Sequence, residues 1–215
     1  MIQTKEDLKR YLAADLARYG KHKPRWWTKF TFSETWMIHS YFRNIRYLEY
    51  YQNNRHWYNL PALLFCTLKQ RRMALKYSIN VSSHCLGPGF YYVHPGFFRV
   101  NGDVQIGANA TVLPNVLIGR RRPDKDANIR IGDNVYIATG VTILGPVTIG
   151  NNVTIAANSV VIKDIPDNSV VSGVPAQLIK KQQVTPPPTS HNAAIPNIGY
   201  SSLPPTSAQE EPNDK

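Results

Sequence analysis

Aliphatic residues recur at every sixth position through the middle of the chain, a period that fits neither an α-helix nor a simple two-faced strand. The first file consists of Val100, Ile106, Val112, Ile118, Ile131, Ile137, Ile143, Ile149, Ile155 and Val161. A second file, four positions on, consists of Val104, Val116, Val135, Val141, Val147 and Val153. This period is typical of a parallel β-helix, in which three hexapeptides close one coil and aliphatic side chains stack inside it.

Turn-forming residues separate the aliphatic positions and suit corners that need unusual backbone angles. They are Asn109, Asn115, Asn134, Gly140, Asn151 and Asn152. One interruption breaks the rhythm, because Ile118 and Ile131 are thirteen residues apart rather than twelve, with the charged stretch GRRRPDKDANIR between them. We expect this stretch to form a loop that stands out from one corner, where binding groups are common.

The flanking segments have other patterns. Leucines at helical spacing, with Thr4 as a cap and Gly20 as an end, predict a helix over residues 4–19, and further helices are expected over 33–52 and 60–76. The proline-rich stretch 182–215 has few apolar residues and is predicted to be a disordered tail. The expected organisation is therefore a helical domain over 1–76, a β-helix over 77–181 and the tail.

Positive charge is concentrated in the first third of the chain. Residues 1–80 hold 15 Lys and Arg against 5 Asp and Glu, a net charge of +10. This balance suggests an anionic neighbour, such as phospholipid headgroups, a phosphorylated carrier or nucleic acid. Nucleic acid is the weakest of these because no zinc-finger, RRM or helix-turn-helix signature accompanies the charge. The basic, tryptophan-containing stretch KHKPRWWTKF (21–30) suits peripheral contact with an anionic membrane.

The remaining composition excludes several classes of protein. No run approaches the roughly 18 apolar residues of a membrane span, and the charged N-terminus has no secretory apolar region, so we expect a cytoplasmic protein. Cys66 and Cys85 lack metal-ligand spacing and are expected to be free, buried thiols. The sequence contains no phosphate-binding loop, dinucleotide fingerprint or metal-ligand cluster, so no metal is expected.

The stretch FYYVHPGFF (90–98) sets His94 among five aromatic residues, directly before the first regular repeats. A neutral imidazole suits the removal of a proton from a hydroxyl near pH 7. An aromatic wall around the ring would keep it unprotonated. A buried histidine bonded to a backbone carbonyl is the structural alternative.

The histidine stretch FYYVHPGFFRVNG, the repeats, and the ending SVVIKDIPDNSVVSGVPAQLI resemble the hexapeptide-repeat acyltransferases, within them the serine acetyltransferase-like branch, over about residues 76–181. The resemblance implies a left-handed parallel β-helix after an N-terminal helical domain. It also implies a homotrimer or a dimer of trimers, with acetyl-CoA bound between neighbouring β-helices. His94 falls at the position of the family's catalytic base.

The resemblance carries further residues with it. Ala138 and Ala157 match small positions that meet pantetheine, and Lys163 matches a basic position near the nucleotide phosphates. Serine enzymes pair the histidine with an upstream aspartate, at a position where this chain has Ile79 or Asn80, and of these two Asn80 alone has a side chain that could bond the ring. An amide can orient the ring but cannot offset the charge of the imidazolium.

The acceptor is where the sequence departs from the serine enzymes. Their arginine and histidine in the extruded loop are replaced by the stretch 124–127, where Lys125 offers only a point charge and Arg120 is not at the matching position. The GPGF run (87–90) looks like that of capsule and exopolysaccharide acetyltransferases, which favours a free or lipid-linked sugar acceptor, with Tyr92 and His84 as candidate contacts. The alternatives are a serine O-acetyltransferase and, from another class, an inactive trimeric scaffold.

Overall fold

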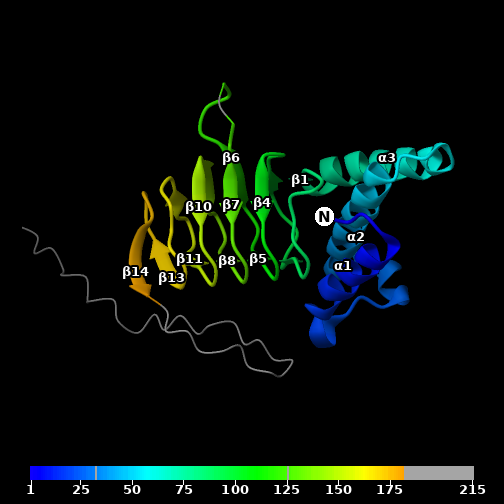
Figure 1. Cartoon of the computed structure of the whole chain (residues 1–215). Coiled ribbons are helices and arrows are strands. Elements are labelled where there is room, and N and C mark those ends of the chain that lie inside the picture. Colours follow the sequence, from blue (N-terminus) through cyan, green and yellow to red (C-terminus); the bar gives the residue numbers. More distant parts are fainter. Residues whose placement is uncertain (32, 125, 182–215) are drawn as a thin grey trace, which may run out of the picture. The chain divides into compact units, whose positions relative to one another are not determined.

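The computed structural model describes residues 1–31, 33–124 and 126–181, with only the backbone described for Trp26 and Lys29. Helices come first and a stack of short strands follows (Figure 1). The α-helices are α1 (Lys5–Ala17), α2 (Glu34–Asn53) and α3 (Leu60–Tyr77). Three short 3-10 helices are η1 (Gly20–His22), η2 (Trp26–Lys29) and η3 (Trp57–Asn59). The predicted disordered tail lies outside the described residues.

Local sequence signals set the ends of the helices. The Thr4 hydroxyl accepts a hydrogen bond from the Asp7 backbone N–H at 3.0 Å, and the Asp7 carboxylate accepts one from the Thr4 N–H at 3.1 Å. These two bonds form a capping box that starts α1 as predicted. Pro61 lies in the first turn of α3, where its missing N–H is harmless. Ser33 precedes α2, although its side chain makes no capping hydrogen bond.

The strands form three sheets, which are the three sides of a parallel β-helix (Figure 1). Sheet A contains β1 (Ile79–Val81), β3 (Phe98–Val100), β6 (Val116–Arg120), β9 (Thr142–Gly145) and β12 (Val160–Val161). Sheet B contains β4 (Val104–Ile106), β7 (Ile129–Ile131) and β10 (Val147–Ile149). Sheet C contains β2 (Tyr91–Tyr92), β5 (Thr111–Val112), β8 (Tyr136–Ile137), β11 (Thr154–Ile155), β13 (Ser169–Ser172) and β14 (Gln177–Lys181).

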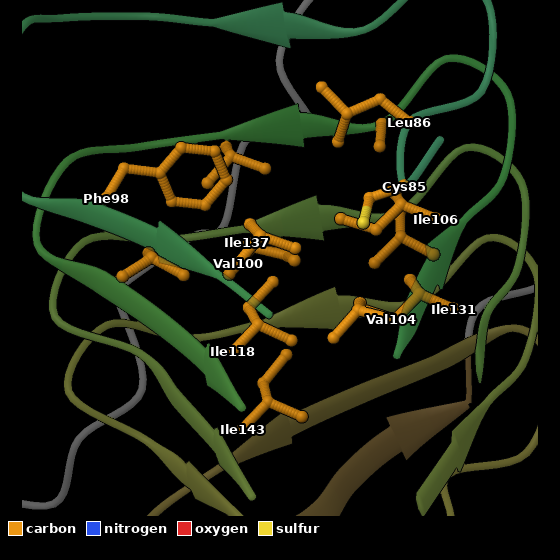
Figure 2. Close-up of a cluster of buried hydrophobic side chains, with 14 of the residues drawn as sticks. Cys85, Leu86, Phe98, Val100, Val104, Ile106, Ile118, Ile131, Ile137 and Ile143 are labelled. Atoms are coloured by element: carbon orange, nitrogen blue, oxygen red, sulfur yellow. The ribbon is translucent and has the colours of Figure 1, made fainter. Parts of the chain in front are cut away.

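The predicted aliphatic files make up the interior of the coils. Every member of both files is at most 4% exposed. Figure 2 shows Ile118, Ile137 and Ile143 with their side chains turned toward the shared interior. Burying one such side chain contributes about 1.5–3 kcal/mol, so the repeated file is the main source of stability for the β-helix. The period-six prediction is confirmed.

Asparagines at one corner form a ladder that runs along the coils. Asn109, Asn134, Asn152 and Asn168 all have a positive φ, between 55° and 59°. Their side chains are joined by hydrogen bonds of 3.2, 3.2 and 2.9 Å in that order. Asparagine tolerates this backbone region better than most residues, which explains its repetition. Asn151, also expected at such an angle, is not among the positive-φ residues that the structure describes.

A buried ion pair joins the helices to the first coil. Arg46 in α2 is 1% exposed, and its Nε lies 2.8 Å from the Asp15 carboxylate in α1. The same guanidinium donates to the carbonyls of Leu86 and Gly87, both at 2.7 Å. Asp15 also accepts from the Gly89 N–H at 2.9 Å. One carboxylate and one guanidinium thereby fix the angle at which the helices meet the coil.

The last strand differs from the others in direction. β14 pairs with β13 antiparallel, whereas the other paired strands of the described residues run parallel. All five residues of β14 are exposed. Cys66 and Cys85 are free and buried, as predicted, and burial raises the pKa of the Cys85 thiol to about 12.

Candidate active site

His94 lies at a corner of the first coil, in the segment that leads from β2 to β3. The backbone carbonyl of Gly96, in the same turn, accepts a hydrogen bond from the Tyr92 hydroxyl at 3.1 Å. This bond closes the turn, and it leaves the His94 side chain 64% exposed on the outside of the coil. His94 is therefore available to a ligand, and the alternative of a buried structural histidine is excluded.

The ring of His94 has a carboxylate neighbour from the helical part of the chain. Its Nδ1 lies 3.3 Å from Oε2 of Glu34, the first residue of α2. A carboxylate in the first turn of a helix lies near the positive end of the helix dipole, which is a favourable position for it. Glu34 is itself 60% exposed, which leaves space for a ligand or a second chain to cover the pair.

This contact determines which nitrogen of His94 can act as a base. When Nδ1–H donates to the carboxylate, the lone pair of the neutral ring is on Nε2. The carboxylate then stabilises the imidazolium that forms when Nε2 takes up a proton. Glu34 was not identified from the sequence, because it is 60 residues from His94 and belongs to no repeat.

The aromatic residues around His94 are core residues rather than a wall around its ring. Phe90, Tyr92 and Phe98 are at most 3% exposed. Tyr92 stacks on Phe98 with ring centroids 5.0 Å apart, and burial raises the pKa of its hydroxyl above the usual range. The expectation that Tyr92 contacts a substrate is corrected by its burial and by its bond to Gly96. Within the stretch, Phe97 is the exposed ring, at 42%.

Asn80 and His84 do not take the places expected of them. Asn80 lies on the exposed side of β1, and the group next to the His94 ring is the Glu34 carboxylate instead. His84 lies in the segment that leads from β1 to the next side of the first coil, a different corner from His94. There its Nε2 is 3.1 Å from Oδ1 of Asn53, and its backbone N–H donates to Glu49 at 2.7 Å. His84 thus connects the coil to α2.

The predicted cofactor residues are divided between two corners. We call the segments that join sheet C to sheet A, residues 93–97, 113–115, 138–141 and 156–159, the His94 corner. Ala138 and Ala157 lie on it, two and three coils from His94, which is roughly 10 and 15 Å at the spacing of neighbouring strands. Lys163 lies on the corner between sheets A and B, which also carries the extruded loop. We call this second corner the loop corner.

The loop between β6 and β7 stands out from the coils as predicted (Figure 1). At its base Arg120 lies 2.7 Å from Asp103 and 3.7 Å from Asp126. The hydrogen bond from Arg120 holds the pKa of the Asp103 carboxyl below its usual value. Arg120 is therefore already paired with carboxylates, and Lys125 lies outside the described residues.

The GPGF run has a structural explanation. The backbone N–H groups of Gly89 and Phe90 donate to the buried Asp15 carboxylate at 2.9 and 3.1 Å. Gly89 has a φ of +73°, which favours glycine. The run therefore fits the first coil to the helices. Among the described residues no cluster of His, Cys, Asp and Glu could hold a metal ion.

Comparison with known proteins points to one group of enzymes. Residues 128–163 match the family described as bacterial transferase hexapeptide (six repeats). The chain is 35% identical over 120 residues to a serine acetyltransferase of Staphylococcus aureus strain Mu50, covering 52% of this chain and 54% of that protein. It is 39% identical over 98 residues to the serine acetyltransferase of Staphylococcus xylosus, covering 42% and 43%. The chain thus spans about half the length of the curated relatives it matches.

Solved structures agree on the fold. A serine acetyltransferase from Brucella abortus strain S19 superposes with a TM-score of 0.66 at 23% identity, covering 84% of this chain and 72% of that one. A serine acetyltransferase structure in complex with CoA superposes with a TM-score of 0.61 at 18% identity, covering 81% and 71%. The fold is the expected left-handed parallel β-helix preceded by helices.

Proposed function

We propose that this protein is an acetyl-CoA-dependent O-acetyltransferase in which His94 is the general base and Glu34 positions it. The observation that carries the proposal is the 3.3 Å contact between Nδ1 of His94 and the Glu34 carboxylate, on an exposed corner of the β-helix. The similarity to serine acetyltransferases over half of the chain supports the same reaction class.

The proposed reaction is a direct transfer. Nε2 of His94 takes the proton of the acceptor hydroxyl, and the oxygen forms a bond to the carbonyl carbon of the thioester. The tetrahedral intermediate then collapses as the carbon–sulfur bond breaks. The imidazolium returns its proton to the departing thiolate, so that the products are the acetyl ester and CoA. Glu34 keeps the ring in the tautomer that this sequence requires.

The His94 corner suits an extended thioester substrate. The segments that carry Ala138 and Ala157 follow His94 along it, and Ala157 is exposed. Small side chains leave the backbone there open to an amide-containing arm. Lys163 lies on the loop corner. It could therefore meet the phosphates of acetyl-CoA only when that molecule is bound at the His94 corner of a neighbouring copy. A homotrimer that sets the loop corner of one copy beside the His94 corner of the next supplies both parts of the site.

L-serine is the first acceptor that we propose, because the curated relatives are serine acetyltransferases. A cytoplasmic location, expected from the sequence, would give the enzyme access to both serine and acetyl-CoA. For the transfer step itself, the serine hydroxyl requires a base, and His94 supplies one.

A sugar hydroxyl is the second candidate, and one observation favours it. The carboxylate of serine needs a cationic partner, ideally a forked guanidinium. Arg120, at the base of the loop, is already held by Asp103 and Asp126, and the Arg121 guanidinium donates to the Ile162 carbonyl at 2.8 Å. A free or lipid-linked sugar has no carboxylate to satisfy at this position.

Release of free CoA thiol from acetyl-CoA tests the proposal against a panel of acceptors. The panel contains L-serine and free, nucleotide-linked and lipid-linked sugars, with the His94→Ala variant as the control for background hydrolysis. Acceptor-dependent thiol release that His94→Ala lacks supports the enzyme. A folded, oligomeric wild-type protein that transfers acetyl to no member of the panel would favour an inactive scaffold.

A further inference from the structure

The outer face of α3 exposes apolar side chains, and basic residues lie among and beside them. The exposed apolar side chains are Leu60, Leu64, Phe65, Leu68 and Leu75, with exposed fractions of 52, 60, 66, 56 and 87%. The exposed leucines fall within one narrow arc, since 3.6 residues per turn brings positions four and seven apart to the same side. The opposite side of α3 packs on α2, where Cys66 and Gln70 are buried. Among the described residues nothing covers the leucine arc.

The charges on α3 are all of one sign. The helix carries Lys69, Arg71, Arg72 and Lys76 and contains no Asp or Glu. By their helical positions, Arg71 lies within the leucine arc and Arg72 borders it. Trp57 and Tyr58, in η3 just before the helix, are 83 and 60% exposed. Leucines flanked by cations, with aromatic residues beside them, are the features of a helix that lies in the interface of an anionic membrane.

We infer that the leucine arc of α3, together with η3, is a docking surface for an anionic lipid bilayer. This surface goes beyond the proposed acetyl transfer and does not depend on it. Charge complementarity favours the bilayer over a second copy of the chain, because a second α3 presents the same cations and no carboxylate to pair with them. None of the described helices has the length and apolarity needed to cross a membrane.

The groove beside the arc supports the same partner. Phe65 borders a groove of about 570 Å³ between α2 and α3. Its lining combines the cationic side chains of Arg43 and Lys69 with the rings of Trp36 and Tyr47. Positive charge within an aromatic lining suits a phosphate headgroup, which carries negative charge at the surface of the acyl region. The groove extends the contact from the hydrocarbon boundary to the headgroups.

The sequence predicts membrane contact for the stretch 21–30, but fewer of its side chains are described than on α3. Trp27 and Phe30 are 46 and 71% exposed, and the side chains of Trp26 and Lys29 lie outside the described residues. The surface on α3 is longer and is supported by side chains that the structure describes. It is therefore the surface to test.

Co-sedimentation of the full chain with vesicles tests the inference. The two vesicle types are phosphatidylcholine alone and phosphatidylcholine with about one third phosphatidylglycerol. We expect the wild-type protein to pellet with the anionic vesicles and to remain in the supernatant with the neutral ones, with binding weakened by high salt. Equal binding to both types, or binding to neither, overturns the inference.

Two pairs of variants locate the surface. Leu64→Ser with Leu68→Ser, and separately Arg71→Gln with Arg72→Gln, should each reduce the apparent affinity for anionic vesicles about tenfold or more. The matched controls are Leu178→Ser with Ile179→Ser, and Lys180→Gln with Lys181→Gln, on exposed β14. Controls that lose binding as much as the α3 variants overturn the assignment to α3.

Light scattering on the same proteins separates a bilayer from a second copy. If the leucine variant halves the mass of the wild-type assembly while the wild type binds no vesicles, α3 is an interface between copies and the inference is wrong. Unchanged mass together with lost vesicle binding supports it. Neither measurement depends on acetyl transfer, so failure here is distinct from failure of the proposed function.

Discussion

At the scale of single residues, the chemistry of His94 depends on a side chain that comes from a different part of the chain. An imidazole that is 64% exposed exchanges freely between its two neutral tautomers in water. The Glu34 carboxylate, 3.3 Å from Nδ1, favours the tautomer with its lone pair on Nε2. The two side chains therefore have separable roles in the proposed reaction, and each role has its own test.

Replacing His94 with Ala should remove the proposed base. We expect kcat to fall by on the order of 10²–10⁴-fold, the usual contribution of an acid–base group. The melting temperature should change little because the side chain is largely exposed. Thiol-release kinetics and a thermal melt on the same preparation check both expectations. A folded variant with wild-type turnover would remove His94 from the mechanism.

Glu34→Gln should keep the shape of the side chain and remove its charge. We expect kcat to fall about tenfold, which corresponds to a hydrogen bond to a charged group of roughly 1.4 kcal/mol. KM for acetyl-CoA should be unchanged, because in the proposed site Glu34 contacts His94 and not acetyl-CoA. Glu34→Asp should recover part of the lost rate, since it restores the charge. If Gln and Asp variants behave alike in the pH profile of kcat, Glu34 has only a structural role.

At the scale of secondary structure, each coil requires close approach of the backbone to the next coil. A Cβ added to Gly132 would lie 2.8 Å from the backbone carbonyl of Gly150, which is closer than packed atoms allow. A Cβ added to Gly119 would lie 4.0 Å from its nearest neighbour, the side chain of Asn101. The two glycines thus differ in the space around them.

Gly132→Ala should therefore destabilise the protein by about 1–3 kcal/mol through overpacking. Gly119→Ala is the matched control and should lie within about 1 kcal/mol of the wild type. Urea unfolding monitored by circular dichroism gives both values. Equal midpoints for the two variants would show that the coils can separate locally to accommodate a methyl group.

The contact between α1, α2 and the first coil has a different energetic character. Asp15→Asn preserves shape but leaves the Arg46 guanidinium buried with a weaker partner, Glu49 at 3.9 Å. Removing one member of a buried pair typically costs about 3–5 kcal/mol. The control Asp7→Asn, at a half-buried position, weakens the capping box of α1 and the 3.0 Å contact with the exposed Arg10, and should cost about 1 kcal/mol. Comparable losses in urea unfolding would show that the buried pair is unimportant.

Repeated local packing could be predicted from the sequence, whereas single contacts between distant residues could not. The aliphatic files at 100–118 and 131–161 report a local, repeated packing rule, so the β-helix and the extruded loop follow from spacing alone. The pair between Asp15 and Gly89 joins residues 74 positions apart and leaves no periodic trace. Glu34 and His94 meet for the same reason, through the way α2 packs on the first coil.

At the scale of the whole molecule, the proposed site needs more than one chain, and mixing subunits tests this. His94 and Lys163 lie on different corners, so in a trimer each site would take one residue from each of two neighbours. Lys163→Ala alone should weaken acetyl-CoA binding. Co-assembly of equal amounts of His94→Ala and Lys163→Ala subunits should then restore about a quarter of the sites by random pairing.

That mixture should be more active than either variant by itself. The control is the same two proteins purified separately and combined without subunit exchange, which should show no gain in activity. If Lys163→Ala is fully active, or if co-assembly gives no recovery, the two corners do not share a site. Sedimentation of the wild type should show a multiple of three times the 24.3 kDa chain.

The antiparallel strand β14 has a consequence for how long the solenoid can be. A stack of parallel coils has an open sheet edge at each end, onto which another stack could add and grow into a fibre. At one end, β14 pairs with β13 and presents exposed residues that include Lys180 and Lys181. At the other end, the Arg46 guanidinium donates hydrogen bonds to the carbonyls of Leu86 and Gly87. Between these two ends, the coils share one packing rule, the buried aliphatic files. The number of coils, and with it the reach of the His94 corner, is a quantity that insertion of a whole coil could change without altering either end.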